Sequence, residues 1–317
     1  MKGLKNAFSV IIPMALYMLV EYLVSFFCVF FFAYRQINSN NGGIVPGGTA
    51  RESMIMQAYT YLGDHVLMVS AISAAICIVI FYFSVNRLWL KKAYRYVPDG
   101  SMVRPYVLTV ILSVGFTLAA NLFVNAVGMF SYAQDYAEIS RQMYSEPIYM
   151  QILAIVLLVP MAEELMFRGL IYERSCRFMN EKMAVIMTSL LFGFYHGNWI
   201  QMVYAFFFSL LMFFVYDKCG SFKAALLFHI VSNASAICLN QLTLLTTMQF
   251  SIGIVVTAVI GIAAFMIMRR EDYCERVPLD IYNDQLWQDS TDMHDQEVDE
   301  NGLEDDERQT YSEDDEM

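Results

Sequence analysis

The stretch of sequence that decides the fold is IYMQILAIVLLVPMAEELMFRG, residues 148–169. Its first part is an apolar run, and a helix of roughly 20 predominantly apolar residues can cross the hydrocarbon core of a bilayer. Its last part carries two adjacent acids, Glu163 and Glu164, and the base Arg168. Charges at bilayer depth cost about 2.5–3.5 kcal/mol each on insertion scales, so they usually face a protein interior or a water-filled cavity. The stretch therefore predicts a membrane helix that carries part of a buried polar site.

Long apolar runs recur along most of the chain. Of the 317 residues, 57% are hydrophobic and only 16% are charged, which favours the bilayer as solvent. The candidate membrane helices are Ala7–Tyr34, Val66–Val85, Tyr106–Val127, Ile148–Met166, Met183–Tyr195, Ile200–Tyr216, Phe222–Asn240 and Phe250–Met268. The fifth and sixth are short, so they are either two spans or one broken helix, and we interpret them as two. The sequence thus predicts an all-α, polytopic helical bundle of about eight spans in the cell membrane.

The distribution of lysine and arginine predicts the orientation of these spans. Cytoplasmic loops of membrane proteins collect these bases. With eight spans and a cytoplasmic N-terminus, the external loops hold only Arg35, Arg51 and Arg141. Merging the two short spans would place Lys218 and Lys223 outside. The charge pattern therefore favours eight spans with both termini in the cytoplasm.

Composition divides the chain into four parts. Three N-terminal membrane helices occupy residues 1–147, a core with most of the intramembrane polar residues occupies 148–240, and a final membrane helix occupies 241–270. The remaining residues, 271–317, are strongly acidic and account for the net charge of −11. A segment so charged and so poor in apolar residues cannot bury enough surface to fold, which predicts a disordered cytoplasmic tail. The six cysteines show no C-x-x-C pair and no disulfide-like spacing.

The charged residues of the fourth span divide into a pair and a single acid. Side chains four residues apart stack on one helical face, so Glu164 and Arg168 should form an ion pair. Adjacent residues point about 100° apart, so Glu163 should face a different surface. This makes Glu163 a candidate general base. The alternative is that all three residues form a structural cluster, and Glu21 in the first span, which has no partner in sequence, is expected to be structural.

Polar residues of two later spans are candidates for the same site. His229 and Asn233 lie four residues apart on the seventh span, and Phe192 and His196 have this spacing on the fifth. A carboxylate and an imidazole can polarise water, and an imidazole with an amide can stabilise an oxyanion, so with Glu163 these groups would suffice for hydrolysis. The acid and both imidazoles could instead hold Zn²⁺. Taken singly, a histidine or asparagine in a membrane is more often an interhelical hydrogen-bonding residue.

Three motifs in this order, each on its own helix, resemble the CPBP family, which comprises the CAAX prenyl endopeptidases of type 2 and the bacteriocin-processing or Abi proteins. The motifs are Glu163-Glu164-x-x-x-Arg168, Phe192-x-x-x-His196 and His229-x-x-x-Asn233. They lie within residues 148–240, under a third of the chain. The resemblance implies an all-helical membrane core with an intramembrane peptidase site that opens toward the cytoplasm.

The resemblance also implies a role for each motif residue. Glu163 matches the base that activates water, aided by His196. His229 and Asn233 match the pair that stabilises the oxyanion, and the remaining acid and arginine of the first motif match its supporting pair. The family's chemistry is either glutamate-dependent without a metal or that of a zinc metalloprotease with Glu163, His196 and His229 as ligands, and we favour the metal-free form slightly.

The predicted function is therefore an intramembrane endopeptidase that cuts a peptide or a membrane-associated protein entering from the cytoplasmic face. The alternative is a non-catalytic immunity or scaffold protein that binds a peptide partner and keeps the polar cluster for stability. Intact motifs argue against this alternative. A transporter ranks third because the chain shows no duplicated halves. The lipid bilayer is an expected partner, and nucleic acid is not.

Overall fold

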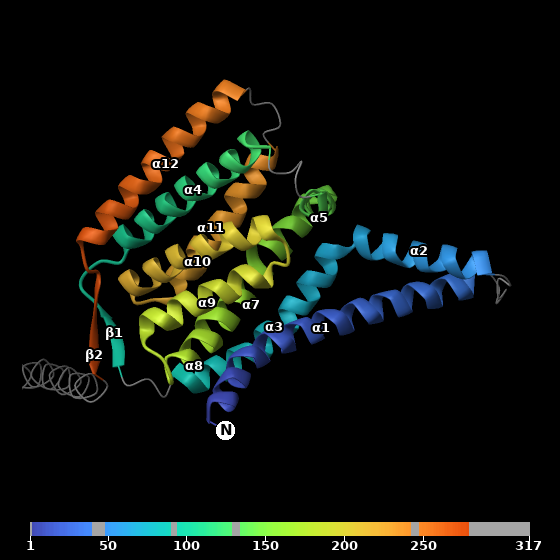
Figure 1. Ribbon diagram of the computed structural model, residues 1–317, viewed down its shortest axis with the longest axis horizontal. Coiled ribbons are helices and arrows are strands. Elements are labelled where there is room, and N and C mark those ends of the chain that lie inside the picture. Colours follow the sequence, from blue (N-terminus) through green and yellow to red (C-terminus); the bar gives the residue numbers. More distant parts are fainter. Residues whose placement is uncertain (1, 40–47, 90–93, 129–133, 242–246, 279–317) are drawn as a thin grey trace, which may run out of the picture.

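The computed structural model describes residues 2–39, 48–89, 94–128, 134–241 and 247–278. Most of this part is helical, and the helices form a bundle from which α1 and α2 project together (Figure 1). The predicted all-α fold class is confirmed. The longer helices are α1 (Lys2–Ser39), α2 (Gly48–Asp64), α3 (Val66–Trp89), α4 (Val103–Ala126), α10 (Trp199–Cys219), α11 (Phe222–Gln241) and α12 (Thr247–Arg270), and the shorter ones include α5 (Gln134–Ser145) and α9 (Glu181–Tyr195).

Within the described residues, seven helical stretches are long and apolar enough to cross a membrane, and each coincides with a predicted span. The chain is a multi-pass integral membrane protein. The predicted span that is not among the seven is α9, whose 15 residues fall short of the roughly 20 that an ordinary crossing needs. Helices α9 and α10 are separate, because the side chain of Asn198 accepts a hydrogen bond from the Gln201 N–H at 2.9 Å and caps α10.

The fourth span is one continuous helical stretch that alternates between α and π winding. Its parts are α6 (Ile148–Gln151), η2 (Ile152–Leu158), α7 (Val159–Glu164), η3 (Leu165–Tyr172) and α8 (Glu173–Ser175), with η2 and η3 in the π form. Pro160 has no N–H to donate to a preceding carbonyl, which interrupts the α-helical ladder at this point. Wide π turns are rare and often accompany functional sites. The two acids of the first motif lie on α7, between the two π segments.

Close packing around α4 fixes the position of α11. A Cβ added to Gly115 would lie 2.7 Å from the Gly261 Cα, so small residues let the backbones of α4 and α12 approach closely. On the other side of α4, the Ser113 hydroxyl donates to the Phe228 carbonyl at 2.7 Å. The Thr117 hydroxyl lies 2.8 Å from that of Ser232. Helix α11, which carries His229, is therefore hydrogen-bonded to α4 on both sides of that residue.

A small sheet was not predicted from the sequence. Strand β1 (Tyr94–Pro98) pairs antiparallel with β2 (Cys274–Pro278), and Tyr96 lies opposite Arg276. The prediction that the whole of residues 271–317 is disordered is therefore wrong at its start, because residues 274–278 are paired. The rest of the predicted tail, residues 279–317, lies outside the described residues.

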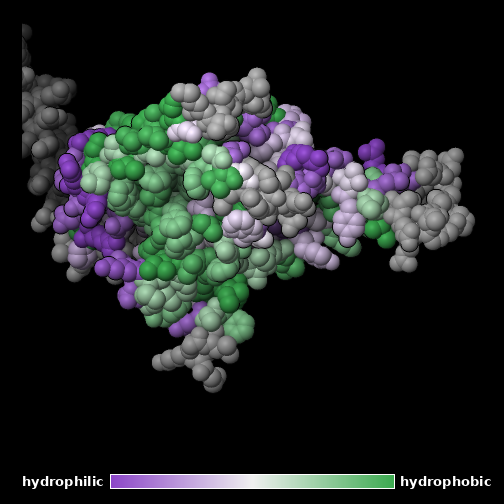
Figure 2. Space-filling view, turned by 45° about the horizontal axis from the view of Figure 1, so that its top comes forward, coloured by the Kyte–Doolittle hydropathy of each residue, from purple (hydrophilic) through white to green (hydrophobic). Residues whose placement is uncertain are grey.

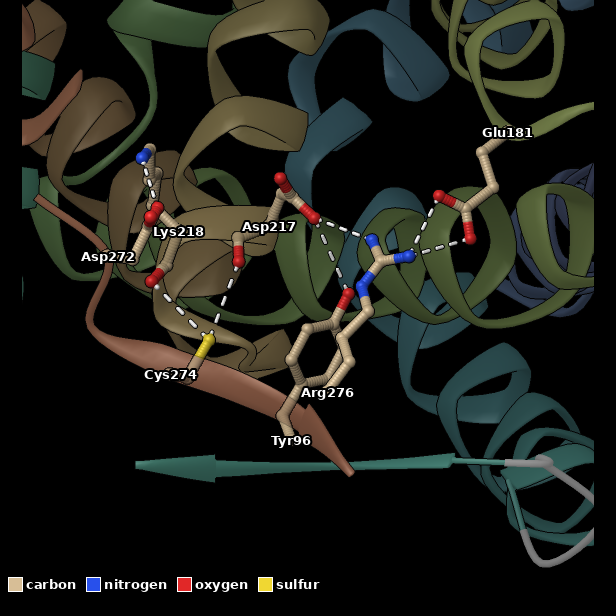
Figure 3. A network of polar contacts seen from close by, with 7 residues as sticks. All are labelled: Tyr96, Glu181, Asp217, Lys218, Asp272, Cys274 and Arg276. Atoms are coloured by element: carbon tan, nitrogen blue, oxygen red, sulfur yellow. Dashed lines mark hydrogen bonds and ion pairs between the residues drawn. The ribbon is translucent and has the colours of Figure 1, made fainter. Parts of the chain in front are cut away.

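An ion-paired network joins the sheet to the bundle (Figure 3). Nη1 of Arg276 lies 2.9 Å from both carboxylate oxygens of Glu181, and Nη2 lies 2.7 Å from Asp217 Oδ1. The same guanidinium lies 5.3 Å from the centre of the Tyr96 ring. Lys218 and Asp272 add a third ion pair, of 2.6 Å. We call this unit the clasp: β1, β2 and the side chains of Glu181, Asp217, Lys218 and Asp272.

The clasp marks one end of the bundle, the clasp end. There the Arg174 guanidinium donates to the Ser9 carbonyl at 2.6 Å, and Arg104 pairs with Glu271 at 2.7 Å. The start of α1, the start of α4 and the end of α12 therefore lie at this end, at the lower left of Figure 1, whereas α2 and α5 lie at the other. The space-filling view has hydrophobic surface between a hydrophilic left edge and hydrophilic surface further right (Figure 2). The segments that we predict to be cytoplasmic thus meet at the clasp end, and its cytoplasmic location stays a prediction.

Candidate active site

Two neighbouring carboxylates of α7 meet one imidazole of α11. Nδ1 of His229 lies 2.9 Å from Glu164 Oε1, and Nε2 of the same ring lies 3.6 Å from Glu163 Oε2. The Glu164 side chain is 0% exposed and the Glu163 side chain 8%. An ionised carboxylate only accepts hydrogen bonds, so the ring nitrogen that faces Glu164 carries a proton. Glu164 therefore fixes the orientation of the ring and turns Nε2 toward Glu163.

Arg168 holds Glu164 from the other side. Nη1 of Arg168 lies 2.9 Å from Glu164 Oε1, which is the ion pair expected from the four-residue spacing. Nη2 donates to the Ser209 hydroxyl at 2.8 Å and to its carbonyl at 3.3 Å. The guanidinium also lies 5.0 Å from the Phe192 ring centre and 4.9 Å from that of Phe213. The arginine is fully buried, so its orientation is set by contacts on several sides.

With both carboxylates and the arginine ionised, the cluster is electrically neutral only when it binds one more proton. Glu163 and Glu164 carry one negative charge each, and Arg168 carries one positive charge. An uncompensated buried charge costs several kcal/mol, so the fourth group, His229, balances the set when it is protonated. The proton on Nε2 then lies between the imidazole and Glu163. Nε2 and Glu163 Oε2 are 3.6 Å apart, an ion-pair distance, and a carboxylate beside an imidazolium is suited to acid–base catalysis.

Asn233 is held one helical turn beyond His229. Its side-chain N–H donates to the Ile155 carbonyl at 2.8 Å, across the gap between α11 and η2. A carboxamide has two N–H groups, so this bond positions the second one without using it. The carbonyl belongs to a π-helical segment, where the usual helical hydrogen-bond pattern is altered. The histidine and asparagine of the third motif are thus each fixed by the fourth span.

His196 lies beside the cluster and outside the cavity lining. Its Nδ1 lies 2.7 Å from the Phe192 carbonyl, and its ring centre lies 4.9 Å from that of Phe192. The Phe192 ring also contacts the His229 ring edge to face, at 5.8 Å between centres. The phenyl ring therefore contacts both imidazoles. The structure brings Glu163, His229 and Asn233 to one cavity but does not add His196 to its wall.

A cavity of about 230 Å³ adjoins the cluster. Its deep wall is buried and includes Glu163, His229, Phe192, Phe228 and Met212. Polar atoms of two facing helices, α7 and α11, therefore converge on a space walled largely by aromatic and aliphatic side chains. Such a mixture is typical of sites that bind small molecules or chain segments.

The side chains as placed do not form a zinc site. Structural and catalytic zinc needs three or four N, O or S ligands at about 2.0–2.3 Å. In the part of the chain that the structure describes, no group of three or more His, Cys, Asp or Glu residues is arranged to hold a metal ion. The set that the resemblance suggested, Glu163, His196 and His229, is therefore not gathered around one point. The chemistry that this geometry offers is that of acids, an imidazole and an amide.

Two features of the site were not predicted from the sequence. Glu164 binds His229 as well as Arg168, so it orients the imidazole in addition to forming the expected pair. Ser209 of α10 binds the arginine, although a lone serine in an apolar helix gives no signal of this role. Both contacts join helices that are distant in sequence, and only the assembled bundle reveals them.

Comparisons with known proteins give one match. No curated protein and no solved structure matches the chain. A family model covers less than a third of the chain, yet it includes every residue of the three motifs. Residues 145–235 match the family described as Type II CAAX prenyl endopeptidase Rce1-like, which confirms the predicted resemblance to intramembrane CAAX-type endopeptidases over this region.

Proposed function

We propose that this protein hydrolyses a peptide bond of a membrane-associated polypeptide, with Glu163 as the general base. The family match supports an intramembrane endopeptidase of the CAAX type in general. The observation that carries the mechanism is the arrangement of the two acids: Glu163 lines the cavity, while its neighbour Glu164 holds His229 at 2.9 Å. One carboxylate is free to react because the other is committed to orientation.

In the first step, water attacks the carbonyl carbon of the substrate. Glu163 accepts a proton from the water as the new C–O bond forms, and the carbonyl oxygen becomes an oxyanion. The Nε2–H of His229 and the free N–H of Asn233 are the donors available to this oxyanion from the same wall. Donors of this kind contribute about 10²–10³-fold to the rate when they are fixed in advance. Glu164 and Ile155 hold these two side chains, so both donors are fixed before the substrate binds.

In the second step, the C–N bond breaks. The oxyanion re-forms a carbonyl, and the amine leaves with the proton that Glu163 took from water. The products are a carboxylic acid and an amine, so one water is consumed for each bond cut. His196 does not line the cavity, and in this mechanism the imidazole that assists Glu163 is His229.

The test is cleavage of a quenched fluorescent peptide library by the purified protein in detergent. We expect Glu163→Gln to lower the cleavage rate by about 10²–10⁴-fold, the usual contribution of a general acid or base. The matched control is Glu21→Gln, which removes a half-buried carboxylate from another membrane helix, at a position that does not line the cavity. It should cleave at the wild-type rate.

Two outcomes contradict the proposal. Cleavage by Glu163→Gln at the wild-type rate removes this residue as the base. Absence of cleavage by the wild-type protein, with both variants monodisperse, favours the non-catalytic binding protein. A parallel reaction with a strong zinc chelator distinguishes the mechanisms, since loss of activity after chelation would show that a metal takes part.

A further inference from the structure

The cavity extends in one direction from the acid cluster. Its remaining lining comes from the first turns of α3 and α10, the last turns of α4 and α11, and the outer helix α5. Along this path the side chains change from buried to half-buried, as at Asn121, Ser140, Tyr144 and Gln201. In α5 the neighbours of Ser140, Ile139 and Arg141, are exposed. The cavity therefore leads from Glu163 toward the end of the bundle that carries α5.

No described residue of the clasp lines this cavity. All eight residues of η3, which run from Glu164 toward this end, are buried. The first turns of α4 and α11 and the last turns of α10 do not line the cavity. Beyond them the clasp ties α9, α10 and the segment after α12 together with ion pairs (Figure 3). The site is thus closed on the side where the resemblance led us to expect its opening.

Charge assigns a side of the membrane to each end. Among the described residues, the bases that lie toward the clasp end include Arg95, Arg104, Arg177, Lys218, Lys223, Arg269 and Arg270. Such an excess marks the cytoplasmic side. The α5 end is then non-cytoplasmic. An opening toward the cytoplasm and this charge bias cannot both hold for the same structure.

The size and lining of the cavity restrict what can occupy it. At about 230 Å³ it is smaller than the roughly 300–1,000 Å³ of pockets for drug-sized ligands. It excludes a folded domain and admits only a short stretch of an extended chain. Half-buried polar groups near Ser140 and Gln201 can bind main-chain amides, while the deeper wall is apolar and suits an aliphatic or aromatic side chain.

We infer that the substrate is an extended polypeptide segment exposed on the non-cytoplasmic face of the membrane, and that it reaches Glu163 past α5. This inference rests on the proposed function for its chemistry, whereas the direction of the cavity stands on the lining residues alone.

The first part of the test determines the side of the membrane to which the cavity opens, and it does not require enzymatic activity. Ser140→Cys and, at the clasp end, the exposed Ser101→Cys are made in a Cys238→Ser background, which removes an exposed native thiol. A membrane-impermeant maleimide is applied to right-side-out and to inverted vesicles. We expect labelling above background at position 140 only in right-side-out vesicles, and at position 101 only in inverted ones. The reverse pattern overturns the inference.

The second part of the test determines the route by which the substrate enters the cavity. Each purified cysteine variant is compared with itself before and after attachment of a bulky maleimide. We expect the adduct at position 140 to lower peptide cleavage by at least tenfold and the adduct at position 101 to leave it unchanged. Unchanged cleavage with the adduct at position 140 overturns the route past α5. If the unmodified variants and the wild type all fail to cleave, the proposed function fails, whereas the labelling arm still decides which face the cavity opens to.

Discussion

Removal of the Arg168 guanidinium is the sharpest test of the buried charge cluster. Arg168→Met keeps most of the side-chain length and removes the charge. The ion pair with Glu164 at 2.9 Å is lost, together with the hydrogen bonds to Ser209 and the contacts with two aromatic rings. Glu164 is 0% exposed, so water cannot replace the missing partner. The substitution leaves a buried carboxylate pair with only His229 as a cation.

The expected cost follows from this burial. Breaking a buried ion pair by removing one partner typically costs about 3–5 kcal/mol, because the other charge stays buried without compensation. Replacing both partners with neutral groups is often close to neutral for the same reason. Glu164→Gln keeps an oxygen that can accept from His229 Nδ1. The double variant Arg168→Met with Glu164→Gln should therefore be more stable than Arg168→Met alone.

The measurement is the free energy of unfolding in detergent micelles for the wild type, both single variants and the double variant. We expect Arg168→Met to lose about 3–5 kcal/mol and the double variant to recover at least 1 kcal/mol of that loss. The interaction energy of the cycle isolates the contribution of the pair. A loss below 1 kcal/mol for Arg168→Met, or strictly additive single effects, would refute the account of the cluster as a coupled set of charges.

Two further predictions concern the clasp. Arg276→Ala should lower the free energy of unfolding by about 1–2 kcal/mol, because partly exposed ion pairs contribute about 0–1 kcal/mol each and this arginine pairs with two acids. The control is Arg104→Ala, because the ion pair of Arg104 is more exposed. This control should change the free energy of unfolding by less than about 0.5 kcal/mol. A larger effect at the control would contradict this ranking. Burial, reinforced by the nearby Asp217 carboxylate, raises the pKa of the Cys274 thiol to about 11. The thiol therefore stays protonated at neutral pH, and its alkylation by iodoacetamide, followed by mass spectrometry, should keep accelerating up to pH 10, whereas a plateau near pH 9 would show an ordinary thiol.

The local geometry of the site could be predicted where it depends on one helix. The four-residue spacing of Glu164 and Arg168 predicts their ion pair, and the long apolar runs predict the membrane bundle, because both depend on helical periodicity alone. The contact between Glu164 and His229 joins residues 65 positions apart. Its existence depends on how α4, α11 and the fourth span pack, and no spacing in the sequence encodes it.

The misplaced expectations have the same origin. The family resemblance implied that His196 aids Glu163, whereas the position of its ring depends on packing against Phe192, whose own ring contacts both imidazoles. The strands of the clasp are far apart in the sequence, at residues 94–98 and 274–278, so neither could be predicted without its partner. Strand β2 also lies at the start of a segment whose composition is that of a disordered tail, and the pairing with β1 outweighs the composition over residues 274–278.

The charge balance of the cluster explains why two of these substitutions should behave so differently. Glu163→Gln removes one negative charge, and His229 can restore neutrality by releasing the proton on Nε2. The fold then loses little, while the reaction loses its base, so catalysis and stability separate at this position. Arg168→Met removes the fixed positive charge, so the cluster regains neutrality only when one of its acids takes a proton. A protonated Glu163 is no longer a base, and a protonated Glu164 no longer holds His229 as a charged acceptor. Stability and catalysis should therefore fall together at position 168. A Glu163→Gln protein that unfolds as readily as Arg168→Met would show that His229 does not balance the charge of the cluster as proposed.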